Sequence, residues 1–123
     1  MNEKKKIGKE GEDRAVQYLQ SKKYKIIERN VLKPWGELDI VAIAPDKTLV
    51  FVEVKTMRGR GDDFISPENQ MSFSKIKKFK KAAMIYAGAN ENIIYDEKGW
   101  RLDVVTLQKW GSEYIIYHYE NIE

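Results

Sequence analysis

The sequence lacks cysteine altogether and contains one histidine and three prolines among its 123 residues. Without thiols, neither a cysteine nucleophile nor a thiolate zinc site is available, and no disulfide can support the fold. A Ser-His-Asp hydrolase would depend on His118 alone, and we assign that histidine a place on a strand surface instead. The absence of cysteine agrees with the cytoplasmic location that we expect.

Long apolar runs are absent as well. No run approaches the roughly 20 residues of a membrane-spanning helix, and the N-terminus has no apolar stretch typical of a secretory signal. We therefore expect a soluble protein without a membrane partner. The length matches one ordinary domain, so a single domain over residues 1–123 is the expected organisation.

The spacing of apolar residues predicts two helices and five strands. Helical spacing marks residues 7–22 and 73–88, with Gly88 as the stop signal of the second helix. Segments rich in β-branched and aromatic residues predict strands at 24–32, 37–44, 48–54, 100–108 and 114–119. The first three form an antiparallel meander, and the third is apolar on both faces, as in a strand covered on each side. The sequence therefore predicts an α/β fold of order α-β-β-β-α-β-β.

The lysines of the second helix form a block of positive charge. We expect its inward stripe to consist of Phe73, Ile76, Phe79, Ala83 and Tyr86. The lysines lie elsewhere, with Lys77, Lys78 and Lys81 projecting the opposite way and Lys75 and Lys80 at the boundary. Such a block is typical of a surface that binds a polyanion, and equally of a solvated helix face.

Three acids and a lysine can be placed at one site by strand alternation. Asp39 and Glu53 lie on adjacent predicted strands, and Lys55 shares a face with Glu53. Glu12 projects inward from the first helix, in line with Leu19. Close carboxylates require a cation or a proton between them, which favours a divalent metal with oxygen ligands. The alternative is an ion pair between Glu53 and Lys55 at a sheet edge, and spacing alone leaves both readings open.

Five short motifs carry a resemblance to a known family. They are Gly8-x-x-Gly11-Glu12-x-x-Ala15, Arg29-Asn30, Gly36-Glu37-Leu38-Asp39-Ile40, Phe51-Val52-Glu53-Val54-Lys55-Thr56 and Arg101-Leu102-Asp103-Val104-Val105. In this order, over nearly the whole chain, they resemble the YraN-like family of predicted endonucleases. That family is similar to the PD-(D/E)XK nuclease superfamily and to archaeal Holliday-junction resolvases, although Leu38 replaces the proline of the superfamily motif.

The resemblance implies a restriction-endonuclease-like core, with a mixed five-stranded sheet flanked by helices, and a catalytic set of Glu12, Asp39, Glu53 and Lys55. The implied cofactor is Mg²⁺ or Mn²⁺, held by Asp39, Glu53, Glu12 and the backbone carbonyl of Val54, while Lys55 positions the attacking water. The resemblance adds Gln70 and Lys75 beside the site. Positive charge itself predicts further contacts with the phosphate backbone from Arg58, Arg60, Lys77, Lys78 and Lys81.

The function that follows is metal-dependent hydrolysis of phosphodiester bonds in DNA, including branched or otherwise structured DNA. A homodimer is implied by likeness to the resolvases. Two alternatives stay open: a non-catalytic nucleic-acid-binding module that retains the nuclease fold, and a structural protein whose acids only form ion pairs. Among the remaining residues, we expect Arg101 and Asp103 to form a structural ion pair, and Trp35 is the best tryptophan candidate for contact with substrate.

Overall fold

The computed structural model describes residues 3–58 and 72–123, with side chains for residues 8–57 and 72–123. Its elements follow the chain as α1 (Glu3–Ser21), β1 (Lys25–Lys33), β2 (Gly36–Ile43), β3 (Leu49–Arg58), α3 (Phe73–Ala89), the 3₁₀ turn η2 (Glu91–Ile93), β4 (Trp100–Trp110) and β5 (Glu113–Tyr119). The five strands form one sheet in chain order. Pairing is antiparallel except between β3 and β4, which are parallel because the chain crosses over through α3. The predicted α/β fold, element order and mixed sheet are confirmed.

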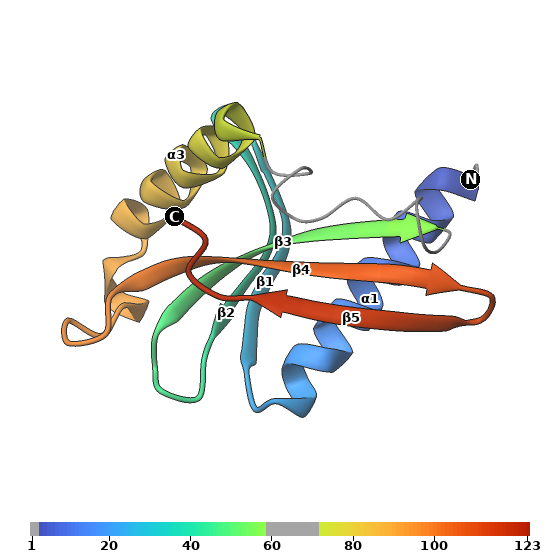
Figure 1. Cartoon of the computed structure of the whole chain (residues 1–123). Helices are drawn as coiled ribbons and strands as arrows, with labels where there is room; N and C mark the ends of the chain where they lie inside the picture. The colour runs from blue at the N-terminus through green and yellow to red at the C-terminus, as the bar shows by residue number, and fades with distance from the viewer. Residues whose placement is uncertain (1–2, 59–71) are drawn as a thin grey trace.

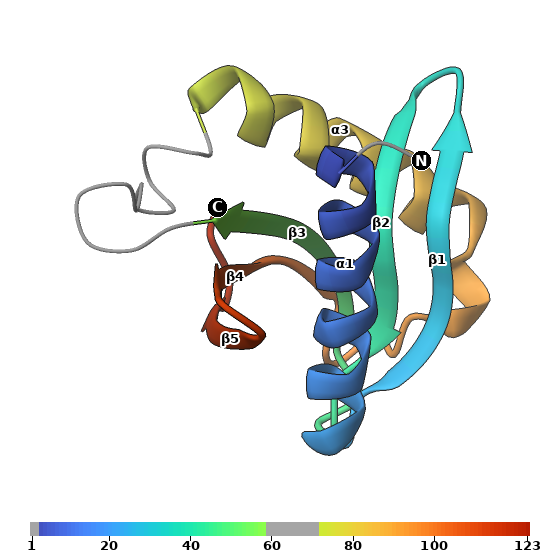
Figure 2. The same cartoon turned by 90° about the vertical axis from the view of Figure 1, so that its right-hand side faces the viewer.

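The two helices cover opposite faces of the sheet, as Figures 1 and 2 show. Under α1 lies a core that includes Leu19, Ile40, Val52 and Val105. Under α3 lies a second core, which includes Phe51. Strand β3 contributes to both cores, and its residues from Leu49 to Val52 are fully buried. Burial on both faces explains why this strand is a continuous apolar run rather than an alternating one.

Strands β2 and β3 separate before β3 ends. Their pairing runs from Ile43 opposite Leu49 to Ile40 opposite Val52 and stops there. Beyond that point the hairpin of β1 and β2 bends away from β3, as both views show. The next backbone N–H group of the ladder, that of Val54, donates instead to the carboxylate of Asp39 at 2.8 Å. The charged residues that follow the buried part of β3 therefore lie beside an opening in the sheet.

Helix α3 agrees with its predicted range to within one residue, but its buried stripe and its stop signal differ from the prediction. The prediction that Phe73 faces inward was wrong, because this first helical residue is 85% exposed. The buried stripe instead includes Ala82 and Ala87 beside Phe79, Ala83 and Tyr86. The prediction that Gly88 ends the helix was also wrong. The helix continues to Ala89, and Gly88 does not adopt the positive φ of a left-handed stop.

Three of the predicted nucleic-acid contacts lie outside the residues whose side chains the structure describes. Strand β3 runs to Arg58, farther than predicted, and the side chain of Arg58 lies outside the described set. Arg60 and Gln70 also lie outside it.

Neither described helix combines the length and the apolarity that crossing a membrane would require.

Candidate metal and nucleic-acid site

Asp39 and Glu53 meet where β2 and β3 separate. The two side chains are hydrogen-bonded to each other, and Asp39 Oδ2 also accepts the N–H of Val54 at 2.8 Å. Lys55 follows on the same face of β3, and its Nζ lies 3.1 Å from Glu53 Oε1. The structure therefore brings together two acids and one lysine that are up to 16 positions apart in the sequence (55 minus 39).

The two carboxyl groups hold protons more tightly than isolated ones. Burial raises the pKa of Glu53 to about 7, with a further contribution from the charge of Asp39, and Lys55 opposes both effects. Burial also raises the pKa of Asp39, although the N–H of Val54 acts in the other direction. A proton shared by the pair removes the repulsion between the two carboxylates, so the pair holds one at pH values below about 7.

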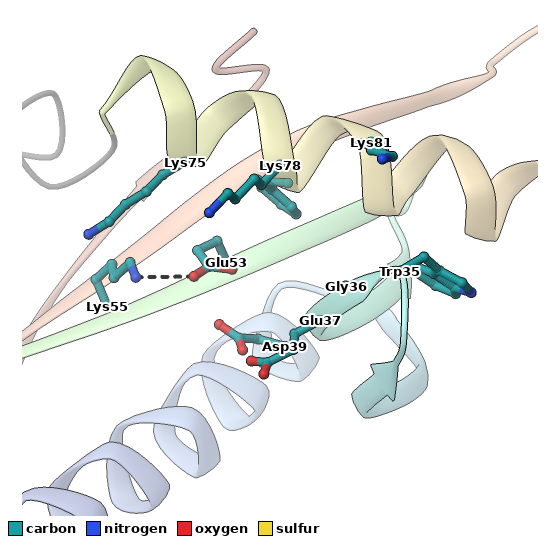
Figure 3. A pocket seen from close by; sticks show the side chains of 10 residues that line it. Trp35, Gly36, Glu37, Asp39, Glu53, Lys55, Lys75, Lys78 and Lys81 are labelled. Carbon is teal, nitrogen blue, oxygen red and sulfur yellow. Dashed lines mark ion pairs between the residues drawn. The ribbon is translucent and has the colours of Figure 1, made fainter.

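A pocket of about 540 Å³ surrounds this pair. Figure 3 shows acids from β2 and β3 on one side and lysines of α3 on the other. Its lining consists of Trp35, Gly36, Glu37, Asp39, Glu53, Lys55, Lys75, Lys78, Phe79 and Lys81. Lys78 and Lys81 are exposed and lie outside the buried stripe, as predicted, but both also border the pocket, which the prediction did not include. Lys77 is exposed and is not part of this lining.

Glycine at position 36 brings the start of β2 against α3. Gly36 has a φ of +149°, and a Cβ built there would lie 3.1 Å from the Cβ of Ala82. A side chain at this positive φ would be strained, and its Cβ would contact Ala82 more tightly than packing normally allows. The start of β2 therefore lies close against α3 at the edge of the pocket.

Glu12 approaches the pair from α1 but is held by another residue. Gly11 lets α1 contact β3 closely, since a Cβ there would lie 1.9 Å from Thr56 Oγ1. Burial raises the pKa of Glu12, and the nearby charge of Asp39 raises it further. Glu12 Oε1, however, accepts from Arg29 Nη2 at 3.2 Å and from Arg29 Nε at 3.4 Å. Glu12 therefore lies near Asp39 while its carboxylate is bound by Arg29.

Arg29 is a site residue to which sequence reasoning gave no role. It lies on β1 and also binds Asp13 at 2.7 Å, and a second pocket of about 430 Å³ includes Glu12, Asp13, Arg29 and Asn30. Asn30 adopts a positive φ of 51° beside it. The Arg29-Asn30 motif was the available signal. Its partner could not be read from spacing, because the contact joins a helix to a strand at the sheet edge.

A second cluster lies under α1, away from this pocket. The possible ligand atoms of Asp103, His118 and Glu120 all lie within 4.8 Å of one another, so the group could hold a metal ion. Both oxygens of Asp103 already have partners. Oδ1 lies 3.0 Å from Arg101 Nε and accepts the N–H of Asn121 at 3.0 Å, and Oδ2 lies 2.7 Å from His118 Nε2.

These contacts test the predictions for the Arg101–Asp103 ion pair and for the position of His118. Burial raises the pKa of Asp103, but the hydrogen bonds from His118, Arg101 and Asn121 outweigh burial and lower it. The expected ion pair between Arg101 and Asp103 is confirmed. The surface position expected for His118 was wrong, because its side chain is 9% exposed and its Nδ1 lies 3.1 Å from the hydroxyl of Tyr18.

Comparison with known proteins places the chain in a family. The model of the family described as "Uncharacterised protein family UPF0102" matches residues 11–107. A UPF0102 protein of Thermodesulfovibrio yellowstonii is 38% identical over 109 residues, which cover 89% of this chain and 91% of that protein. One from Alkaliphilus oremlandii is 40% identical over 117 residues, covering 95% and 97%. The expected YraN-like membership is thus confirmed, and the chain belongs to the UPF0102 family.

Proposed function

We propose that the protein is a metal-dependent endonuclease that hydrolyses phosphodiester bonds in DNA, with residues 1–123 forming one nuclease-like domain. The observation that carries the proposal is the contact between Asp39 and Glu53, with Lys55 beside them, at the opening between two strands. The likeness to the PD-(D/E)XK superfamily and to junction resolvases is part of this proposal. So are the preference for branched or otherwise structured DNA and the homodimer.

The donor set fits a hard divalent cation. Asp39 and Glu53 offer carboxylate oxygens, and the backbone carbonyl of Val54 lies between Glu53 and Lys55 in the chain. Oxygen ligands of this kind suit Mg²⁺ or Mn²⁺ rather than softer metals. The proton that the acid pair holds below about pH 7 neutralises the same charge that such a cation would neutralise. A bound divalent ion would supply an activated water and neutralise charge on the phosphate.

The remaining residues have distinct proposed roles. The ammonium group of Lys55 orients the attacking water and offsets the charge that develops on the scissile phosphate. Glu12 is a further metal ligand, or binds a water of the ion, and Arg29 sets its position. Lys75, Lys78 and Lys81 form the wall that meets the phosphate backbone. Further contacts with the same DNA strand are proposed for Arg58, Arg60, Gln70 and Lys77.

A cleavage assay tests this function. Supercoiled plasmid and a four-way DNA junction are incubated with the protein in Mg²⁺, in Mn²⁺ or in EDTA. We expect cleavage only with a divalent ion, and a loss on the order of a hundredfold or more for Asp39→Asn and Glu53→Gln. Glu37→Gln is the matched control, because Glu37 lines the same pocket but is exposed, and it should cleave within about threefold of the parent.

The same cleavage assay would also identify the alternative function, a nucleic-acid-binding module that does not cleave. A nucleic-acid-binding module that lacks turnover is favoured by one observation: Arg29 binds the Glu12 carboxylate, so that Glu12 does not complete a three-acid cluster with Asp39 and Glu53. In that case the protein binds the junction, but no divalent ion supports cleavage. Cleavage that survives Asp39→Asn unchanged would count against the endonuclease, because it would not depend on this site.

A further inference from the structure

Two tyrosines of β5 lie in line with the proposed site across the sheet. The pairing registers place Glu53, Val104 and Tyr119 in one cross-strand row. The neighbouring row contains Lys55, Thr106 and Tyr117. Paired residues point to the same face of a sheet, so both tyrosines share the face of Glu53 and Lys55. Two strand spacings separate them from β3, which is roughly 10 Å.

The tyrosine rings form a stacked pair at this face. Their centroids are 6.4 Å apart, with an angle of 28° between the ring planes. Tyr117 is 43% exposed, so part of its ring faces solvent. The opposite face of β5 is used differently, since Tyr114 and Ile116 pack into the core under α1. The exposed ring of Tyr117 therefore lies on the face of β5 opposite the one that packs into the core under α1.

A buried hydroxyl lies between the lysine and the tyrosine. Thr106 is fully buried, and its Oγ1 is the one buried side-chain oxygen or nitrogen without a hydrogen-bond partner among the described residues. An unsatisfied buried hydroxyl costs about 1–3 kcal/mol, so such atoms call for a partner. Because Thr106 has no exposed surface, an enclosed water is the partner that fits its burial.

We propose that Tyr117 and Tyr119 form a stacking platform for an unpaired base of the nucleic-acid strand bound at Asp39, Glu53 and Lys55. This inference rests on the proposed function and names its substrate class, DNA with unpaired nucleotides beside the bond that is cut. Aromatic rings stack on a base of any sequence once that base is out of a duplex. The lysine wall on the other side of the acids meets the backbone of the same strand.

Binding without metal tests the platform separately from catalysis. Fluorescence anisotropy in EDTA compares a labelled thymine homopolymer with a blunt duplex of the same length. We expect Tyr117→Ala and Tyr117→Leu to weaken binding of the single strand on the order of tenfold, and binding of the duplex by less than about twofold. Tyr117→Phe should retain the parent affinity. Because none of these changes alters charge, the slope of affinity against salt should stay the same.

Tyr95→Ala provides a matched control, because Tyr95 is an exposed tyrosine in the turn before β4. Tyr117→Leu keeps an apolar side chain on the strand, so it remains informative if the alanine variant folds poorly by circular dichroism. Equal single-strand affinity in the parent and Tyr117→Leu would overturn the platform. So would a change in oligomeric state by sedimentation, which would assign this face to a second copy of the chain. Absence of cleavage with an intact Tyr117 effect would overturn only the endonuclease.

Discussion

Glu53 lies in an environment unlike that of an ordinary surface acid. Its carboxyl is mostly buried, hydrogen-bonded to Asp39 and 3.1 Å from the ammonium of Lys55. Burial and the neighbouring acid keep a proton on this group up to a pH of about 7, whereas the unfolded chain releases it near 4.5. The same contacts that fit a cation therefore make the stability of the fold depend on pH.

The sign of this dependence can be predicted. Between pH 4.5 and about 7 only the folded chain holds the Glu53 proton. The free energy of unfolding should therefore fall as pH rises through this window, by at most about 3 kcal/mol, and stay low above it. Glu53→Gln removes the titration and should flatten the curve, so that this variant is more stable than the parent at about pH 8.

Urea denaturation across this pH range is the measurement. Glu97→Gln is the control for the loss of one acid, because Glu97 is exposed in the turn before β4 and should leave the slope with pH unchanged. A Glu53→Gln curve parallel to that of the parent would show that Glu53 does not carry the proton in the folded chain.

At the scale of elements, the approach of α1 to β3 depends on one missing side chain. A Cβ at Gly11 would lie 1.9 Å from Thr56 Oγ1, which is closer than two atoms can pack. Gly8, one turn earlier on the same helix, has no atom within 4 Å of such a Cβ. The sequence motif contains both glycines, but only Gly11 is required by packing.

We expect Gly11→Ala to lower the free energy of unfolding by about 1–3 kcal/mol through this clash. Gly8→Ala should raise it by about 0.5–1 kcal/mol, because alanine is the better helix former. Chemical denaturation of both variants tests the pair. Thr56→Ala combined with Gly11→Ala should recover part of the loss, and a double variant no more stable than Gly11→Ala would locate the clash elsewhere.

Helix α3 should contribute charge selectively to nucleic-acid binding. Lys78 and Lys81 border the acidic pocket, whereas Lys77 is exposed outside its lining. Replacing Lys78 and Lys81 with Ala should weaken DNA binding and reduce the slope of log affinity against log salt by about 0.9 for each phosphate contact that is lost. Lys77→Ala, which removes the same kind of charge, should have the smaller effect. Equal effects of all three changes, measured by anisotropy at several salt concentrations, would indicate a diffuse electrostatic surface.

On the scale of the whole molecule, the site exists because two halves of the sheet meet there. The β1–β2 hairpin contributes Asp39, and the parallel pair of β3 and β4 contributes Glu53. Helices on opposite faces contribute Glu12 and the lysine wall. A cation bound to Asp39 and Glu53 would therefore link parts of the chain that separate on unfolding, and would stabilise the whole fold.

We expect Mn²⁺ to raise the melting temperature, and to do so more at about pH 8 than at about pH 5.5, because the acid pair must lose its proton to bind a cation. Calorimetric titration at about pH 6 in buffers of different ionisation enthalpy should show release of about one proton per ion. Asp39→Asn should abolish both effects. If Asp103→Asn abolished them instead, the metal would lie in the cluster with His118.

The sequence by itself determined the order of elements and the candidate acids. Apolar spacing has a period of its own in helices and in strands, and alternation places Glu53 and Lys55 on one face. It did not determine which partners these acids find. Some contacts join segments that are far apart in the chain, such as the binding of Glu12 by Arg29 and the burial of His118. Others depend on how a helix lies on the sheet, such as the position of Lys78 beside the pocket. Local periodicity carries no information about such contacts. These contacts depend on the separation of β2 from β3 and on the packing of the two helices on opposite faces of the sheet.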